Sequence, residues 1–128
     1  MEYLWVGIGG FIGANARFIV GRWIGGRSGD TLAFPVGTLL VNITGSLLIG
    51  LALALVVGKV SFADPAWRLL VIVGVLGGYT TFSAFSAETV LLIEDGRTGA
   101  AVTYVVATNL LGLLACFMGL AAGRALLR

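Results

Sequence analysis

Long apolar runs separated by short polar segments make up nearly the whole chain. The four runs are about residues 4–23, 34–57, 66–93 and 98–124. A membrane-spanning helix needs about 20 predominantly apolar residues, and each run meets that length. The pattern predicts an all-α membrane protein with four transmembrane helices in a single domain, residues 1–128. The segment 94–97 is so short that it predicts a hairpin between antiparallel helices.

The composition narrows the function classes. Only 11% of the 128 residues are charged, against roughly 25% in soluble domains, and mean hydropathy is +1.05. The first apolar run lacks a basic leader, so no cleavable signal peptide is expected. One cysteine and no histidine exclude the common zinc, haem and iron–sulfur ligand sets and any His-dependent catalytic triad. We therefore expect no enzyme. We also expect no nucleic-acid binding, since the net charge is only +2.

Basic residues are almost evenly divided between the two ends of the predicted helices. One end carries Lys59, Arg68, Arg124 and Arg128, and the other carries Arg17, Arg22, Arg27 and Arg97. An asymmetry in Lys and Arg normally sets membrane orientation, and here it is nearly absent. Two interpretations stay open: a single orientation decided by the N-terminal amine or one arginine, or insertion in both orientations.

Small residues recur at helical spacing. Gly9 and Gly13 are four residues apart, as are Gly119 and Gly123, and such pairs let helices approach closely in lipid. A four-helix subunit of this size cannot easily surround a pore alone, so we expect two or more copies to pack together.

Polar residues form stripes on two of the predicted helices. Thr38, Asn42 and Ser46 are spaced by four in the second run. An asparagine at mid-membrane needs a partner, so Asn42 predicts either a hydrogen bond between helices or an amide facing a pore. Tyr104 and Thr108 form a weaker stripe in the fourth run, and Tyr104 is open to the same two interpretations.

The third run is too long for a continuous helix. Residues 67–93 would extend about 40 Å, whereas the hydrocarbon core is about 30 Å thick. A break near Gly77 and Gly78 is predicted, and irregular backbone at membrane depth is typical of a binding site or permeation path. The carbonyls of residues 77–80 would face a cation, and the hydroxyls of Thr80, Thr81 and Ser83 could cap the second half.

Phe82 and Phe85 share a helix face beside these hydroxyls, with Glu88 three residues further on. Aromatic rings have positive edges, so the pair could line the path of a small anion, although phenylalanines are more often packing residues. Glu88 is open to three interpretations: a carboxylate reaching water, a vestibule charge, or a proton carrier.

Three segments together resemble one known family, the Fluc (CrcB) fluoride channels. They are Gly-Gly-Phe-Ile-Gly-Ala-Asn-Ala-Arg at 9–17, Gly-Thr-Leu-Leu-Val-Asn at 37–42, and Gly-Gly-Tyr-Thr-Thr-Phe-Ser-Ala-Phe-Ser at 77–86. They occur in the family's order, and the resemblance covers essentially the whole chain.

The resemblance implies an antiparallel, dual-topology homodimer with two pores, each lined by both subunits. It implies that Phe82 and Phe85 face fluoride with their ring edges and that Asn42 is the pore asparagine. It also implies that backbone carbonyls of Gly77 and Thr80 from both subunits hold a structural sodium ion. The other positions it implies along the path are Thr38 in the vestibule, Thr81 and Ser83 on a polar track, Tyr104 beside the pore, and Arg17 with a structural or electrostatic role at the mouth.

The implied activity is passive export of fluoride across a bacterial inner membrane, with lipid and a second copy as partners. Gly112 and Ala84 stand where some relatives carry hydroxyls, which puts those contacts in doubt. A small proton-coupled exporter is one alternative, but it requires a carboxylate embedded in the first helix, and Glu2 is too close to the terminus. A non-transporting assembly protein is another; it would explain the glycines but not the polar break.

Overall fold

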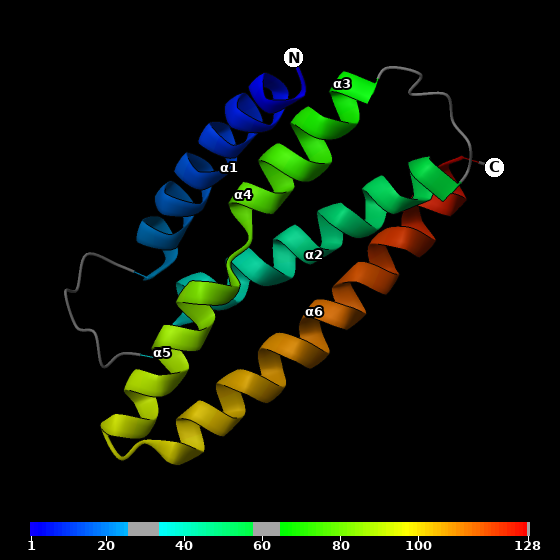
Figure 1. Cartoon of the computed structure of the whole chain (residues 1–128). Coiled ribbons are helices and arrows are strands. Elements are labelled where there is room, and N and C mark those ends of the chain that lie inside the picture. The colour runs from blue at the N-terminus through cyan, green and yellow to red at the C-terminus, as the bar shows by residue number, and fades with distance from the viewer. Residues whose placement is uncertain (26–33, 58–64, 128) are drawn as a thin grey trace.

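The computed structural model describes residues 1–25, 34–57 and 65–127 and arranges them as four helical rods (Figure 1). Three rods are the helices α1 (Glu2–Gly25), α2 (Val36–Val57) and α6 (Thr98–Leu126). The third rod consists of α3 (Pro65–Arg68), the π-helix η1 (Leu69–Leu76), α4 (Gly77–Tyr79) and α5 (Phe82–Glu94). All four are long and apolar enough to cross a membrane. The chain is therefore a multi-pass membrane protein, and the expected all-helical fold with a broken third helix is confirmed.

The rods form two close pairs that cross. In Figure 1, α1 lies along the first half of the third rod, and α2 lies along α6. After the break, α5 leaves α1 and runs beside the first turns of α6. The start of α1 and the end of α6 lie at one end of the bundle, and the turn between α5 and α6 lies at the other. Of the basic residues weighed above, Arg27, Lys59 and Arg128 lie outside the described residues.

Local sequence explains where the third rod begins and ends. Pro65 occupies the first helical position, where its missing N–H costs nothing and its fixed φ suits the helix. At the far end, Gly96 has φ 74°, a conformation that glycine adopts without strain. The Gly96 N–H donates to Ile93 O and the Arg97 N–H to Leu92 O, both at 2.9 Å. This pair of bonds is a Schellman motif, and it forms the predicted hairpin.

Glycines allow the two rods within each pair to approach each other closely. A Cβ on Gly9 would overlap the Leu70 carbonyl oxygen, and one on Gly13 would overlap that of Val75. On the other pair, a Cβ on Gly119 would overlap the Leu47 carbonyl oxygen, and one on Gly123 would overlap the Ala54 side chain. The predicted role of these four glycines in helix packing is confirmed.

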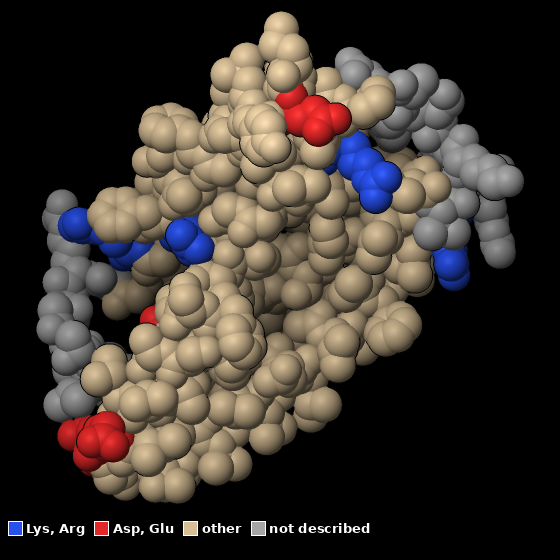
Figure 2. All heavy atoms as spheres, viewed as in Figure 1, with Lys and Arg blue, Asp and Glu red and all other residues tan. Residues whose placement is uncertain are grey.

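The buried core is small and aromatic, and the outside is apolar. Phe85, Leu92, Ala101 and Tyr104 form the core cluster between α5 and α6. Many large apolar side chains are exposed on the outer faces, including Phe11, Phe18, Leu110, Leu113 and Phe117. Figure 2 shows the same pattern, with few charged atoms on a mostly uncharged surface. Such a surface suits lipid or another membrane-embedded chain.

The break lies at Thr80 and Thr81, just beyond the glycines near which the sequence placed it. Gly77 and Gly78 remain helical, and the extended residues are Thr80 (φ −77°, ψ 157°) and Thr81 (φ −149°, ψ 117°). Gly78 is used instead for packing, because a Cβ there would come within 2.9 Å of the Gly10 carbonyl oxygen on α1. The predicted break near Gly77–Gly78 is confirmed, and the structure places it at two threonines whose partners lie on other helices.

Candidate functional site

The side chain of Thr81 starts the second half of the broken helix. Its Oγ1 accepts the Ala84 N–H at 3.2 Å, which is the bond that an N-cap residue provides. The same Oγ1 lies 3.3 Å from the hydroxyl of Ser83. The expected capping role is confirmed for Thr81. The hydroxyl of Thr80 instead donates to the Leu76 carbonyl at 3.1 Å, so it serves the first half.

Asn42 binds the backbone of the break from α2. Its Oδ1 accepts the Thr81 N–H at 2.9 Å, and its Nδ2 donates to the Thr81 carbonyl at 3.2 Å. The hydrogen bond between helices that the sequence offered as one interpretation is therefore present. The amide retains a second N–H and a second acceptor lone pair, which leaves capacity for another partner.

Arg17 binds the other extended residue. One of its guanidinium nitrogens donates to the Thr80 carbonyl at 3.2 Å. A carbonyl that ends a helix carries partial negative charge and favours a nearby cation. Arg17 on α1 and Asn42 on α2 thus hold consecutive residues of the break from two different helices.

The break also releases a carbonyl that no helical N–H reaches. In an unbroken helix the Thr81 N–H would bond to the carbonyl of Gly77, but here it bonds to Asn42. Gly77 is exposed, and together with Thr80 it lines a cavity of about 380 Å³. No cluster of His, Cys, Asp or Glu that could hold a metal exists among the residues described. The groups at this place that suit a hard cation are backbone carbonyl oxygens.

The two phenylalanines differ sharply in exposure. Phe82 is 79% exposed, whereas Phe85 is 9% exposed. Their ring centroids are 5.5 Å apart with the planes tilted by 46°, and Phe85 also packs on Tyr104 at 5.2 Å. Both rings line the 380 Å³ cavity together with Asn42 and Thr81. Four of the candidate pore residues are therefore brought together at this cavity, whereas Thr38 lines the other cavity described below and Ser83 lines neither. Phe82 presents its ring outside the subunit.

Glu88 joins three helices through its two carboxylate oxygens. Thr38 on α2 donates to Oε1 at 2.7 Å, and Tyr104 on α6 donates to Oε2 at 2.6 Å. Glu88 is half-buried, and Tyr104 is completely buried, with its ring edge-on to Phe34. Because hydrogen bonds to a charged group are strong, this network fixes α5 against α2 and α6. Tyr104 lies in the core and lines neither of the two cavities described here.

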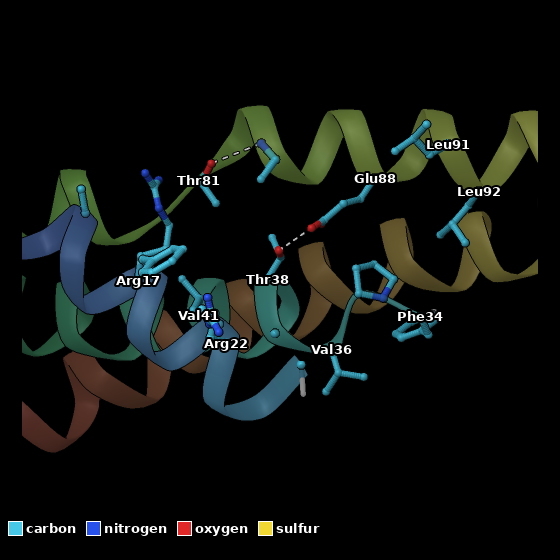
Figure 3. A pocket seen from close by; sticks show the side chains of 17 residues that line it. Arg17, Arg22, Phe34, Val36, Thr38, Val41, Thr81, Glu88, Leu91 and Leu92 are labelled. Carbon is cyan, nitrogen blue, oxygen red and sulfur yellow. Dashed lines mark hydrogen bonds between the residues drawn. The ribbon is translucent and has the colours of Figure 1, made fainter. Parts of the chain in front are cut away.

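A second, larger cavity of about 700 Å³ lies between α1, α2 and α5. Figure 3 shows Arg17, Thr38 and Glu88 extending into it from the three helices. Thr81 lines both cavities, so the break separates one space from the other. The mouth-and-vestibule residues expected from the sequence, Arg17, Thr38 and Glu88, lie on the walls of the larger cavity.

Comparison with known proteins identifies the family. The model of the family described as CrcB-like protein, Camphor Resistance (CrcB), matches residues 4–120. The chain belongs to the CrcB-like family. Proteins named fluoride-specific ion channel FluC match it over nearly their whole length. Those of Rhizobium meliloti and Acidobacterium capsulatum are 49% and 46% identical, covering 96% of each chain. That of Thermus thermophilus is 43% identical, covering 98% of this chain and 95% of the relative. The resemblance inferred from three segments is confirmed.

The structure of this CrcB-like chain also shows contacts at the site that the sequence did not predict. The hydroxyl of Thr108 lines the smaller cavity and is buried without a hydrogen-bond partner among the described residues. Tyr79, the last residue before the break, has its hydroxyl 3.0 Å from that of Thr44. The spacing of four from Tyr104 marked Thr108 as polar, but it did not show an unpaired group. A hydroxyl contact was in doubt at Gly112. A Cβ at this position would lie 3.5 Å from the Ser46 hydroxyl oxygen, which is an ordinary van der Waals distance.

Proposed function

We propose that this protein is a passive, fluoride-selective channel that exports cytoplasmic fluoride across a bacterial inner membrane. The relatives' names support fluoride as the ion, and the family supports a channel rather than an enzyme. One structural observation carries the proposal for this chain. The helix breaks at Thr80–Thr81 between two cavities, and the rings of Phe82 and Phe85 follow directly.

The path runs from the larger cavity, past the break, along the two phenylalanines. Fluoride holds its hydration water tightly, so a path must supply hydrogen-bond donors and positive partial charge as water is lost. The hydroxyls of Thr81 and Ser83 are donors that can rotate towards the ion. The edges of Phe82 and Phe85 carry the positive part of the ring quadrupole, and the spare N–H of Asn42 adds a further donor.

The pore is completed by a second copy in the opposite orientation, so an antiparallel homodimer contains two pores. Two observations support this assembly. Phe82 is 79% exposed although it belongs to the path, so a single subunit cannot enclose it. Thr108 and Asn109 bring further polar groups to the same cavity, and such groups are expensive against lipid. The even distribution of basic residues removes the usual bias towards one orientation.

A sodium ion would lie at the centre of that dimer, held by carbonyls of Gly77 and Thr80 from both subunits. The free Gly77 carbonyl at a helix C-terminus supports this role. The Thr80 carbonyl already accepts from Arg17, so only its second lone pair remains for the ion. Sodium supplies positive charge that offsets the facing carbonyls. Replacing sodium by a large organic cation should shift detergent-purified protein from dimer to monomer in sedimentation. An unchanged dimer would contradict the proposed ion.

Growth in fluoride tests the export function. A bacterial host that lacks its own fluoride exporter should grow in fluoride when it carries this protein, and it should not grow when it carries Phe82→Ile. Both proteins must be shown in the membrane fraction at equal levels. Growth failure with the wild-type protein at that level contradicts the proposed function.

A further inference from the structure

The larger cavity has more positive than negative charge on its described walls. Its charged lining residues are Arg17, Arg22 and Glu88. Both oxygens of Glu88 accept hydrogen bonds, from Thr38 and from Tyr104, which disperses its charge. Arg17 is tied to the carbonyl of Thr80. Arg22 makes no such bond to the residues that the structure describes, and it is exposed in the last turn of α1.

The position of Arg22 is held by an aromatic ring on its own helix. Its guanidinium carbon lies 5.6 Å from the centroid of Phe18, which is within the range of a cation–π contact. Phe18 also lines the cavity. The contact keeps the charge beside the cavity, although the guanidinium still reaches water. Figure 3 shows Arg22 on the same helix as Arg17, and it follows Arg17 towards the end of α1.

We infer that Arg22 concentrates small anions in the larger cavity and so sets the rate at which they reach the break. The inference rests on the proposed function. It adds a residue that acts on anions before they reach the break, where fluoride is selected over chloride. A cleft with low-dielectric walls focuses the field of the charges that line it. An exposed charge attracts every monovalent anion alike, so Arg22 affects the rate of entry while the choice of fluoride over chloride remains with the break.

The size of the effect follows from Coulomb's law. A unit charge about 8 Å from an anion in water-like surroundings changes its local concentration about two- to threefold. The Debye length is about 30 Å at 0.01 M salt and about 3 Å at 1 M. The contribution of Arg22 should therefore be present at low ionic strength and vanish at high ionic strength.

Arg97 provides a matched control. It lies at the same end of the bundle, at the start of α6, and it is not among the residues that line the larger cavity. Arg22→Gln and Arg97→Gln remove the same charge from the same end of the helices, so they alter any orientation bias equally. Arg22→Lys keeps the charge and loses only the shape of the guanidinium.

The test measures initial fluoride efflux from proteoliposomes at about 0.01 M and about 1 M salt. Arg22→Gln should be about two- to threefold slower than wild type at low salt and equal to it at high salt. Arg97→Gln and Arg22→Lys should match wild type, and the fluoride-to-chloride ratio should not change in any variant.

Three results would overturn the inference while leaving the proposed function intact. They are equal rates for Arg22→Gln and Arg97→Gln at low salt, a loss that persists at high salt, and a changed fluoride-to-chloride ratio. A wild-type protein that carries no fluoride would instead contradict the proposed function itself. Size-exclusion chromatography of each variant identifies a loss that comes from misfolding, because such a loss also alters the elution profile and persists at high salt.

Discussion

The carboxamide of Asn42 pairs with both backbone polar groups of Thr81. Its oxygen accepts the Thr81 N–H at 2.9 Å, and its nitrogen donates to the Thr81 carbonyl at 3.2 Å. Unsatisfied backbone groups at membrane depth are costly, and Thr81 is extended where the helix stops. One side chain on α2 therefore pairs the Thr81 N–H that the first half of the helix leaves without a partner, and it does so beside the proposed path of the ion.

Replacing Asn42 should lower the stability of the protein and its fluoride conduction. In Asn42→Ala the N–H of Thr81 loses its partner, which should cost about 1–3 kcal/mol of stability. Asn42→Asp removes the N–H that the Thr81 carbonyl accepts from Asn42 and adds negative charge beside an anion path, so fluoride efflux should fall to the rate of protein-free vesicles. Asn15→Ala is the control, since within the described part of the chain the Asn15 amide donates to Phe11 on its own helix and to no other residue. Normal efflux in Asn42→Asp would refute this role.

Phe82→Ile and Phe85→Ile should abolish fluoride efflux because isoleucine has no ring edge to offer an anion. Their effects on stability should differ. Phe82 is exposed within the subunit, and Phe85 packs on Tyr104, so only Phe85→Ile should lower the melting temperature noticeably. Phe117→Ile is the control, because Phe117 is exposed and lines neither described cavity. Fluoride efflux at the wild-type rate in Phe82→Ile or Phe85→Ile would show that the replaced ring does not line the path.

Gly45→Ala should displace the break. A Cβ on Gly45 would overlap the Cγ2 of Thr80 and lie 3.2 Å from Cδ1 of Tyr79. Neither group can rotate away easily, because the Thr80 hydroxyl bonds to Leu76 and the Tyr79 hydroxyl lies beside Thr44. We expect a loss of about 1–3 kcal/mol together with slower efflux.

Gly7→Ala is the matched comparison for this prediction. Nothing lies within 4 Å of a Cβ at Gly7, so alanine there should stabilise α1 slightly. Equal melting temperatures and efflux rates in Gly45→Ala and Gly7→Ala would show that close approach at Gly45 is unimportant.

Glu88→Gln separates a passive channel from a proton-coupled exporter. The amide oxygen of glutamine can still accept from Thr38 or Tyr104, but its nitrogen cannot, so one hydroxyl loses its acceptor. We expect a stability loss of about 1–3 kcal/mol, and Glu94→Gln, at the exposed end of α5, should have no effect. Fluoride efflux should persist in Glu88→Gln and should not respond to an imposed pH gradient. Gradient-driven efflux in wild type that disappears in Glu88→Gln would favour the exporter.

The membrane fold could be predicted from sequence because spanning helices need uninterrupted apolar runs of a fixed length. The exact break could not. Glycines such as Gly78 are weak helix formers, but this one packs against Gly10 of α1 and remains helical. Thr80 and Thr81 are extended because Arg17 and Asn42, which are distant in sequence, supply their hydrogen bonds.

Site residues could be predicted where they lie in the three segments that match the family. Contacts between helices could not, because they depend on which face each helix turns towards its neighbours. Phe82, Phe85, Asn42 and Thr81 line one cavity. The link from Thr38 through Glu88 to Tyr104 joins three rods, and periodicity within one helix does not reveal which faces meet. The same holds for the hydroxyl of Thr108, which has no hydrogen-bond partner among the described residues.

Selective fluoride conduction is the central claim, and anion efflux from proteoliposomes tests it most directly. Vesicles loaded with potassium fluoride or potassium chloride would be diluted into a buffer that lacks the loaded anion, with a potassium ionophore to balance charge. The release of each anion would be followed with an electrode specific for it. We predict rapid fluoride efflux and chloride efflux no faster than from protein-free vesicles. Chloride efflux as fast as fluoride efflux, or fluoride efflux at the protein-free rate, would contradict the claim.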